Sequence, residues 1–130
     1  MPDVLLGAGA VAAGALIGGP ARHALTQFLA PRIGAKFPWP TMLVNVSGCL
    51  AMGALASYAA AHGYSSHSPF WLLLATGVLG SYTTVSSFAF QTLALVNDGQ
   101  RRTATRYAVL SIAACISAVA AGFTFTELFR

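Results

Sequence analysis

Four long hydrophobic runs, separated by short polar stretches, dominate this chain of 130 residues. The runs cover residues 4–21, 37–61, 69–97 and 107–126, and none of them contains Asp, Glu, Lys or Arg. Each run has about the length that an α-helix needs to cross a bilayer. The pattern predicts an all-α membrane protein with four transmembrane helices, at about residues 4–29, 39–61, 70–96 and 105–126.

The third run departs from an ordinary transmembrane helix in length and composition. A straight helix over residues 69–96 would be about 42 Å long, against a hydrocarbon core of about 30 Å. Its centre holds Gly77 and Gly80 and then a run of Ser, Thr and Tyr hydroxyls, where most spans are aliphatic. We therefore expect this helix to break. Because unpaired backbone in a membrane is tolerated only when it is buried in protein or faces a cavity or ion, the break predicts a functional site.

Composition leaves little room for a soluble function. Hydrophobic residues make up 56% of the chain and charged residues 8%, whereas soluble domains carry about 25% charged residues. Four spans use nearly all of the sequence, so we assign residues 1–130 to one domain without a nucleotide-binding loop. The first run lacks the basic leader of a signal peptide and is expected to remain as a span. No acid, base and nucleophile cluster within the spans, so we do not expect an enzyme.

Basic residues are distributed unevenly between the two sides of the predicted membrane. The second loop has no Lys or Arg, and only Arg130 and the amino terminus share its side. The positive-inside rule then places the first and third loops in the cytoplasm and both termini outside. Because the basic residues stand singly at span ends, the formal charge of +4 does not indicate a nucleic-acid partner. Six basic residues lie in the first and third loops or at the span ends that face them: Arg22, Arg32, Lys36, Arg101, Arg102 and Arg106.

Small residues inside the spans predict close helix packing. Gly14 and Gly18 form a small-xxx-small ridge in the first run, and Gly48 adds a similar position in the second. Cys49 and Cys115 both fall within spans, with no metal-ligand spacing around either. We expect them to behave as small apolar packing residues.

Polar side chains in the second and fourth runs are the candidate chemistry. Asn45 lies in the middle of its run, and Thr41 lies one turn earlier on the same face. A buried amide there either ties helices together or donates hydrogen bonds to a dehydrated anion in a pore. Tyr107, Ser111 and Cys115 recur at every fourth position and line one stripe of the fourth helix. Two polar stripes beside a hydroxyl-rich break indicate a narrow polar path.

An aromatic position follows the predicted break. Val85 and Phe88 are three residues apart, and Gln91 and Thr92 continue the face of Phe88. An aromatic ring carries positive charge at its edge, so a Phe edge can contact an anion favourably in a dry pore. A lone Phe is ordinarily a core residue, and only these neighbours suggest a further role.

Three stretches of the sequence resemble the signature segments of the Fluc/CrcB fluoride channels. They are GGPAR at residues 18–22, FPWPTMLVNVSG at residues 37–48 and GSYTTVSSF at residues 80–88. The order, spacing and four-span layout are similar too, and the resemblance covers essentially the whole chain. It implies an antiparallel dimer with two fluoride pores at the subunit interface, in a multi-pass protein of the inner or plasma membrane. The implied function is passive export of cytoplasmic fluoride, which lowers its toxicity.

The resemblance also implies roles for single residues. A structural sodium ion at the dimer centre would be bound by the backbone carbonyls of Gly80 and Thr83, which suits a hard cation. Arg22 matches a signature arginine. With the positions described above, the candidate pore-lining residues are Thr41, Asn45, Val85, Phe88, Gln91, Tyr107, Ser111 and Cys115.

Two positions depart from the family pattern. The paired-phenylalanine box reads Val85 and Phe88 here, and the last position of the stripe, commonly Ser, is Cys115. Valine has no positive ring edge and no donor, so one pore could be degenerate. That outcome fits a heterodimer made by two genes. The six-to-one basic bias points the same way, because an identical antiparallel pair must insert in both directions. The homodimer remains the default.

Two other classes compete with a channel. A small four-span multidrug exporter needs a carboxylate inside the membrane, whereas Asp3, Asp98 and Glu127 all lie at span ends. A membrane scaffold without transport would explain the packing glycines but not the broken third run.

Overall fold

The computed structural model describes residues 1–33 and 36–129, and all regular secondary structure in them is helical. Four helical segments in this part of the chain are long and apolar enough to cross a membrane. The expectation of an all-helical chain with four long apolar helices is confirmed. The elements are α1 (Pro2–Leu29), α2 (Trp39–Ala61), α3 (Pro69–Trp71), the π-helix η1 (Leu72–Leu79), α4 (Gly80–Tyr82), α5 (Val85–Asn97) and α6 (Arg101–Leu128).

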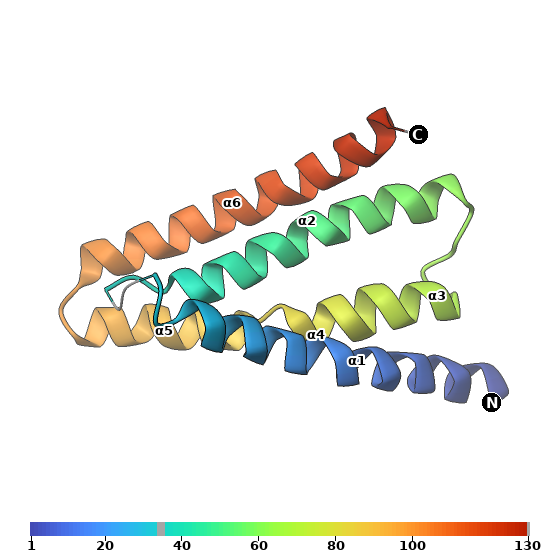
Figure 1. Cartoon of the computed structure of the whole chain (residues 1–130), viewed down its shortest axis with the longest axis horizontal. Helices are drawn as coiled ribbons and strands as arrows, with labels where there is room; N and C mark the ends of the chain where they lie inside the picture. The colour runs from blue at the N-terminus through green and yellow to red at the C-terminus, as the bar shows by residue number, and fades with distance from the viewer. Residues whose placement is uncertain (34–35, 130) are drawn as a thin grey trace.

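The long helices lie side by side along one axis (Figure 1). Both termini and the connection between α2 and α3 lie at one end of the bundle, and the other two connections lie at the opposite end. Helices α2 and α6 run in the same direction and form the most extensive helix pair, while α1 packs along η1 and α4. This arrangement brings α2, α5 and α6 around the point where the helix of the third segment is interrupted, between α4 and α5.

Local sequence explains where the helices begin and end. The Ser68 hydroxyl accepts a hydrogen bond from the backbone amide of Trp71 at 3.3 Å, which caps the start of the third segment. Gly99 follows α5 with φ of +76°, a left-handed conformation that glycine adopts without steric cost. The amide of Gln100 then donates to the carbonyl of Leu95 at 2.8 Å and closes the turn into α6.

Glycines let α2 and α6 approach to backbone contact. A Cβ atom at Gly53 would collide with the carbonyl oxygen of Val119, and one at Gly122 would collide with the carbonyl oxygen of Leu50. Only glycine fits at such positions, so the two helices pack more closely than larger residues would allow. Their relative register is fixed by this contact.

The third segment is held in a similar way on its other side. A Cβ atom at Gly14 would collide with the backbone of η1 at Leu73, and one at Gly18 with the backbone at Val78. Gly48 of α2 lies against the methyl group of Thr83, just after α4 ends. The segment is therefore clamped between α1 and α2.

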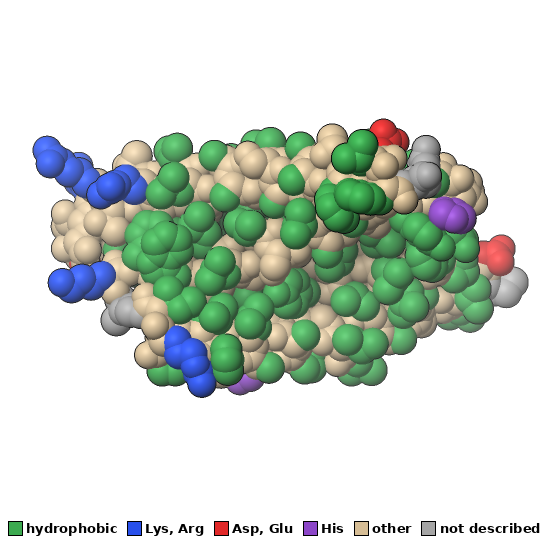
Figure 2. Space-filling model, turned by 45° about the horizontal axis from the view of Figure 1, so that its top comes forward, with side chains coloured by type: hydrophobic (Ala, Val, Ile, Leu, Met, Phe, Trp, Pro, Cys, Tyr) green, Lys and Arg blue, Asp and Glu red, His purple; other side chains and the backbone are tan. Residues whose placement is uncertain are grey.

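Few side chains are buried, and the outer surface is strongly apolar. Val44, Ser57 and Tyr107 are the largest side chains that are almost fully buried in the described part of the chain. Large hydrophobic side chains cover the flank of the bundle, as the space-filling view shows (Figure 2). Lipid can cover such a surface, so a small core is sufficient for a chain that spans the membrane.

Charged groups lie toward the ends of the bundle, with one exception. Lys and Arg side chains gather at the end that holds the first and third connections, and acidic groups are visible at the other end (Figure 2). Arg22 follows the charge-free run of residues 4–21 but lies inside α1, because the helix continues to Leu29. Arg106 likewise lies within α6, which begins at Arg101. Arg130 lies outside the described residues.

Candidate functional site: a polar cavity at the interrupted third segment

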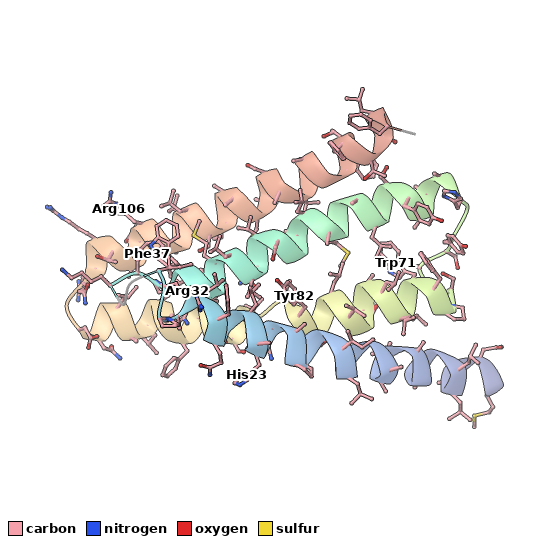
Figure 3. All side chains as sticks on the ribbon, in the orientation of Figure 1. His23, Arg32, Phe37, Trp71, Tyr82 and Arg106 are labelled. Carbon is pink, nitrogen blue, oxygen red and sulfur yellow. The ribbon has the colours of Figure 1, made fainter. Side chains whose placement is uncertain are left out.

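The helical backbone of the third segment is interrupted at two threonines. Helix α4 ends at Tyr82, and Thr83 and Thr84 are extended, with φ and ψ of −77° and 161° and of −149° and 120°. Helix α5 then begins at Val85, where the Thr84 hydroxyl accepts a hydrogen bond from the Ser87 amide at 3.2 Å. Tyr82 lies about midway between the ends of the bundle that carry Arg106 and Trp71 (Figure 3). The non-helical backbone of Thr83 and Thr84 therefore falls at the depth of the membrane interior.

Asn45 of α2 satisfies the backbone of the interruption. Its Nδ2 donates to the carbonyl of Thr84 at 2.9 Å, and the amide of Thr84 donates to its Oδ1 at 2.8 Å. The Asn45 side chain thus pairs both the backbone N–H and the backbone C=O of Thr84, which would bond to other backbone groups in a continuous helix. Because the Thr84 amide is engaged by Asn45, it does not bond the Gly80 carbonyl, its helical partner four residues earlier.

Arg22 bonds the other extended residue. Its Nη1 donates to the carbonyl of Thr83 at 3.3 Å, from a half-buried position inside α1. No ion pair is found for it within residues 1–33 and 36–129. A guanidinium at this depth places positive charge beside the interruption, and such intramembrane charges are commonly functional.

A cavity of about 360 Å³ opens at the interruption, between α2, α5 and α6. None of the residues that line it is charged, and several carry hydroxyl, amide or thiol groups. Five of the predicted pore-lining residues are among them, together with the predicted sodium ligand Thr83. The lining residues are Asn45, Cys49, Thr83, Thr84, Val85, Phe88, Ser111, Ile112 and Cys115.

The other predicted pore residues form a hydrogen-bonded chain beyond the cavity. Tyr107 Oη donates to Gln91 Oε1 at 2.9 Å, and Gln91 Nε2 donates to Thr41 Oγ1 at 2.8 Å. The ring of Phe88 links the two regions, since it lines the cavity and lies 5.3 Å from the Tyr107 ring. Phe37 packs edge-on against the far side of Tyr107, toward the basic end of the bundle.

Ser111 is the least satisfied polar group of the cavity. Its side chain is 4% exposed, and its hydroxyl has no hydrogen-bond partner among the described residues. A buried hydroxyl without a partner costs about 1–3 kcal/mol. An ion or water that accepts this bond would remove the cost, so Ser111 is a candidate donor in the cavity.

Some predicted residues lie outside the cavity, and some lining residues were not predicted. Gly80 is exposed, and Gly14 and Gly18 lie against η1 on the opposite side of the third segment. Thr84 and Cys49 line the cavity but were not proposed as site residues. The signal for Cys49 was its spacing, because positions 41, 45 and 49 of α2 repeat the interval of 107, 111 and 115 in α6.

Residues 9–123 match a family described as CrcB-like protein, Camphor Resistance (CrcB). Fluoride-specific ion channel FluC 2 of Rhodopseudomonas palustris (strain BisB18) is 48% identical over 124 residues, which cover 95% of each chain. Fluoride-specific ion channel FluC 2 of Bradyrhizobium diazoefficiens is 40% identical over 126 residues, or 95% of this chain and 91% of the relative. Fluoride-specific ion channel FluC 4 of Brucella abortus biovar 1 is 43% identical over 114 residues, or 87% and 86%.

Proposed function

The chain belongs to the CrcB-like family, and from that premise we propose that it is a subunit of a passive channel for fluoride. Relatives named as fluoride-specific ion channels align with nearly its whole length. The observation that carries the proposal is the cavity at the interruption, whose walls offer neutral hydrogen-bond donors without any charged side chain. Such a site binds a small dehydrated anion without holding it too tightly to leave.

The donors of the cavity suit fluoride. Ser111 presents an unpartnered hydroxyl, and the Asn45 amide keeps one N–H after its bond to Thr84. Phe88 adds a ring whose edge is weakly positive. Arg22 donates to the Thr83 carbonyl beside the cavity and adds a positive potential that attracts an anion there.

The carboxylates of the chain do not compete with this role. Asp3, Asp98 and Glu127 are exposed and lie near the ends of the helices. A proton-coupled exporter of cations needs a carboxylate in the membrane interior, and the described residues provide none there. The electrostatics therefore favour an anion channel over a multidrug exporter.

A path for the ion continues from the cavity along α5 and α6. Phe88, Tyr107, Gln91 and Thr41 follow one another toward the basic end of the bundle, each in contact with the next. Exchange of hydroxyl and amide hydrogen bonds between these groups and the moving ion would replace lost hydration stepwise.

The pore is completed by a second subunit in this proposal. Val85 lines the cavity and is 80% exposed, so this wall is open on the side away from the chain's own bundle. An antiparallel partner, either a second copy or a homologous chain, would cover it. Two such interfaces give two ion paths. Val85 lines one of these paths but supplies no hydrogen-bond donor to the ion.

A structural sodium ion fits the released backbone. The carbonyl of Gly80 loses its helical donor because the Thr84 amide bonds Asn45. The carbonyl of Thr83 accepts one bond from Arg22 and keeps a second lone pair. Two such pairs, one from each subunit of the dimer, would supply four oxygen ligands of the kind that sodium takes. Side-chain changes at Thr83 should then matter less than changes that alter its backbone.

The cellular task follows from proton chemistry. Fluoride enters a cell from acidic surroundings as neutral HF and is trapped when it loses its proton in the cytoplasm. A passive channel in the inner or plasma membrane lets the inside-negative potential drive the anion out. No nucleotide or proton coupling is required.

Fluoride efflux from liposomes tests the function directly. Vesicles that contain the purified chain should release fluoride and retain chloride, as a fluoride electrode and a chloride electrode report. Asn45→Asp keeps the acceptor for the Thr84 amide but replaces the donor with a charge that repels the anion, so efflux should fall at least about tenfold. Asn97→Asp makes the same chemical change at an exposed position and serves as the control. Vesicles that retain fluoride would contradict a channel made of this chain alone, and equal efflux by the two variants would remove Asn45 from the ion path.

A further inference from the structure

The chain has two cysteines, and they meet in the wall of the cavity. Cys49 of α2 and Cys115 of α6 are free thiols, each half-buried, and both line the cavity. Both residues line the space that the proposed pore uses.

Backbone packing enforces this meeting. Helices α2 and α6 run in parallel, and Gly53 lies against the backbone at Val119. One turn earlier on each helix stand Cys49 and Cys115, in the same relative register. The glycine contact leaves little freedom for either helix to slide, so the pair of thiols is a fixed feature of the bundle.

The surroundings decide which ligand the pair would take. The described residues contain no cluster of three or more His, Cys, Asp or Glu side chains, so a four-ligand zinc site cannot form here. The charged guanidinium of Arg22 does not line the cavity. Two sulfur ligands in an uncharged, largely apolar cavity suit a soft metal ion that prefers two ligands in a line.

We propose that Cys49 and Cys115 together bind one soft, two-coordinate metal ion, of the class of Hg²⁺, Ag⁺ and Cu⁺. With Hg²⁺ as the probe, both S–H bonds break, two S–Hg bonds form and two protons leave to solvent. The product, one Hg²⁺ with two thiolates, is electrically neutral, which a low-dielectric cavity favours. No oxidant or reductant takes part.

The bound ion would obstruct the fluoride path. Ser111 lies one turn before Cys115 on α6 and Asn45 lies one turn before Cys49 on α2, and all four line the same cavity. A metal ion between the two sulfur atoms therefore sits beside the donors that fluoride needs. This consequence rests on the proposed function, whereas the binding itself does not.

Metal stoichiometry tests the site without reference to transport. The purified, reduced full-length protein is titrated with Hg²⁺ in chloride-free buffer, and bound metal and remaining free thiols are measured. We expect one Hg²⁺ per chain with both thiols lost together, and retention of the metal against a monothiol competitor. The variants Cys49→Ser and Cys115→Ser should each release the metal at a competitor concentration at least about tenfold lower than the native protein requires. Two Hg²⁺ per chain, or equal retention by the single variants, would overturn the paired site.

Fluoride efflux from liposomes tests the obstruction. Each protein is compared with its own metal-free rate, and the double variant Cys49→Ser, Cys115→Ser controls for effects of mercury that do not involve thiols. Hg²⁺ should stop efflux through the native protein. For both single variants and the double variant, the ratio of the rate with Hg²⁺ to the metal-free rate should be the same. A single variant that remains blocked would overturn the need for both thiols. Absence of metal-free efflux would overturn a fluoride channel made of this chain alone and leave the stoichiometry to decide the metal site.

Discussion

Two buried serine hydroxyls can be compared, because only one of them lies beside the cavity. Ser57 is buried in α2 and Ser111 is buried in α6. Neither hydroxyl has a hydrogen-bond partner among the described residues. Only Ser111 lines the cavity. An anion in the cavity could therefore accept a hydrogen bond from Ser111, whereas the described part of the chain shows no such acceptor site beside Ser57.

Replacement of each serine by alanine separates these cases. Ser111→Ala should reduce fluoride efflux about tenfold, because a hydrogen bond to a charged group contributes about 1.5–3 kcal/mol. Ser57→Ala should leave efflux unchanged. Both variants should keep or slightly raise the thermal stability in detergent, since each removes an unpartnered buried group. Efflux in liposomes and melting curves measure the two effects, and equal efflux by the two variants would remove Ser111 from the ion path.

Periodicity predicted part of the site, and the rest depended on contacts that sequence does not encode. The stripe of Tyr107, Ser111 and Cys115 was visible because helix geometry places every fourth residue on one face. Thr84 was missed because its importance comes from an extended backbone and from Asn45, which is 39 residues away. Cys49 was treated as packing because a lone thiol carries no signal until its neighbour on another helix is known.

At the scale of elements, the α2–α6 contact positions the cavity residues that come from these two helices. Asn45 and Cys49 come from α2, while Ser111 and Cys115 come from α6. Gly53 sets the distance between the two helices, because its missing side chain lets the backbone at Val119 approach. A change there should disturb the cavity although Gly53 itself does not line it.

Gly53→Ala tests this support. The added methyl group collides with backbone, which cannot move aside as a side chain can, so we expect a loss of about 1–3 kcal/mol of stability and lower efflux. Gly9→Ala is the matched control, because no atom lies within 4 Å of a Cβ at that position of α1. The control should be neutral or stabilising, since alanine favours helix by about 1 kcal/mol over glycine. Thermal unfolding in detergent compares them, and equal melting temperatures would contradict the packing argument.

Hydropathy predicted the four long helices because length and apolar composition determine them directly. It did not predict that η1 would be a π-helix. A pattern of apolar residues does not distinguish backbone hydrogen bonds between residues five apart, as in a π-helix, from those between residues four apart, as in an α-helix. Hydropathy also placed Arg22 at the end of a charge-free run, and charges at such ends ordinarily reach water. The structure satisfies this arginine inside the bundle with the Thr83 carbonyl, a partner created by the interruption of another segment.

At the scale of the whole molecule, the distribution of charge bears on the partner. Arg32, Lys36, Arg101, Arg102 and Arg106 remain at one end after Arg22 is assigned to the interior of α1. The basic end is visible as one group in Figure 2. Such a bias directs insertion with that end in the cytoplasm. If the proposed channel is an antiparallel dimer, identical chains must insert in both orientations, and a chain with a single orientation needs an oppositely inserted, homologous partner.

A topology reporter fused to the C-terminus decides between a second copy and a second chain as the partner. When the chain is expressed alone, we expect signal predominantly from the outer side, because five basic residues stand at the opposite end of the bundle and favour the cytoplasm. Arg101→Gln combined with Arg102→Gln should move part of the signal inside, since it removes two of those charges without touching the cavity residues. His62→Gln combined with His67→Gln changes exposed residues in the connection at the other end and should leave orientation unchanged. Comparable signal from both sides for the native chain would show that it inserts both ways, and the identical antiparallel pair would then be the channel.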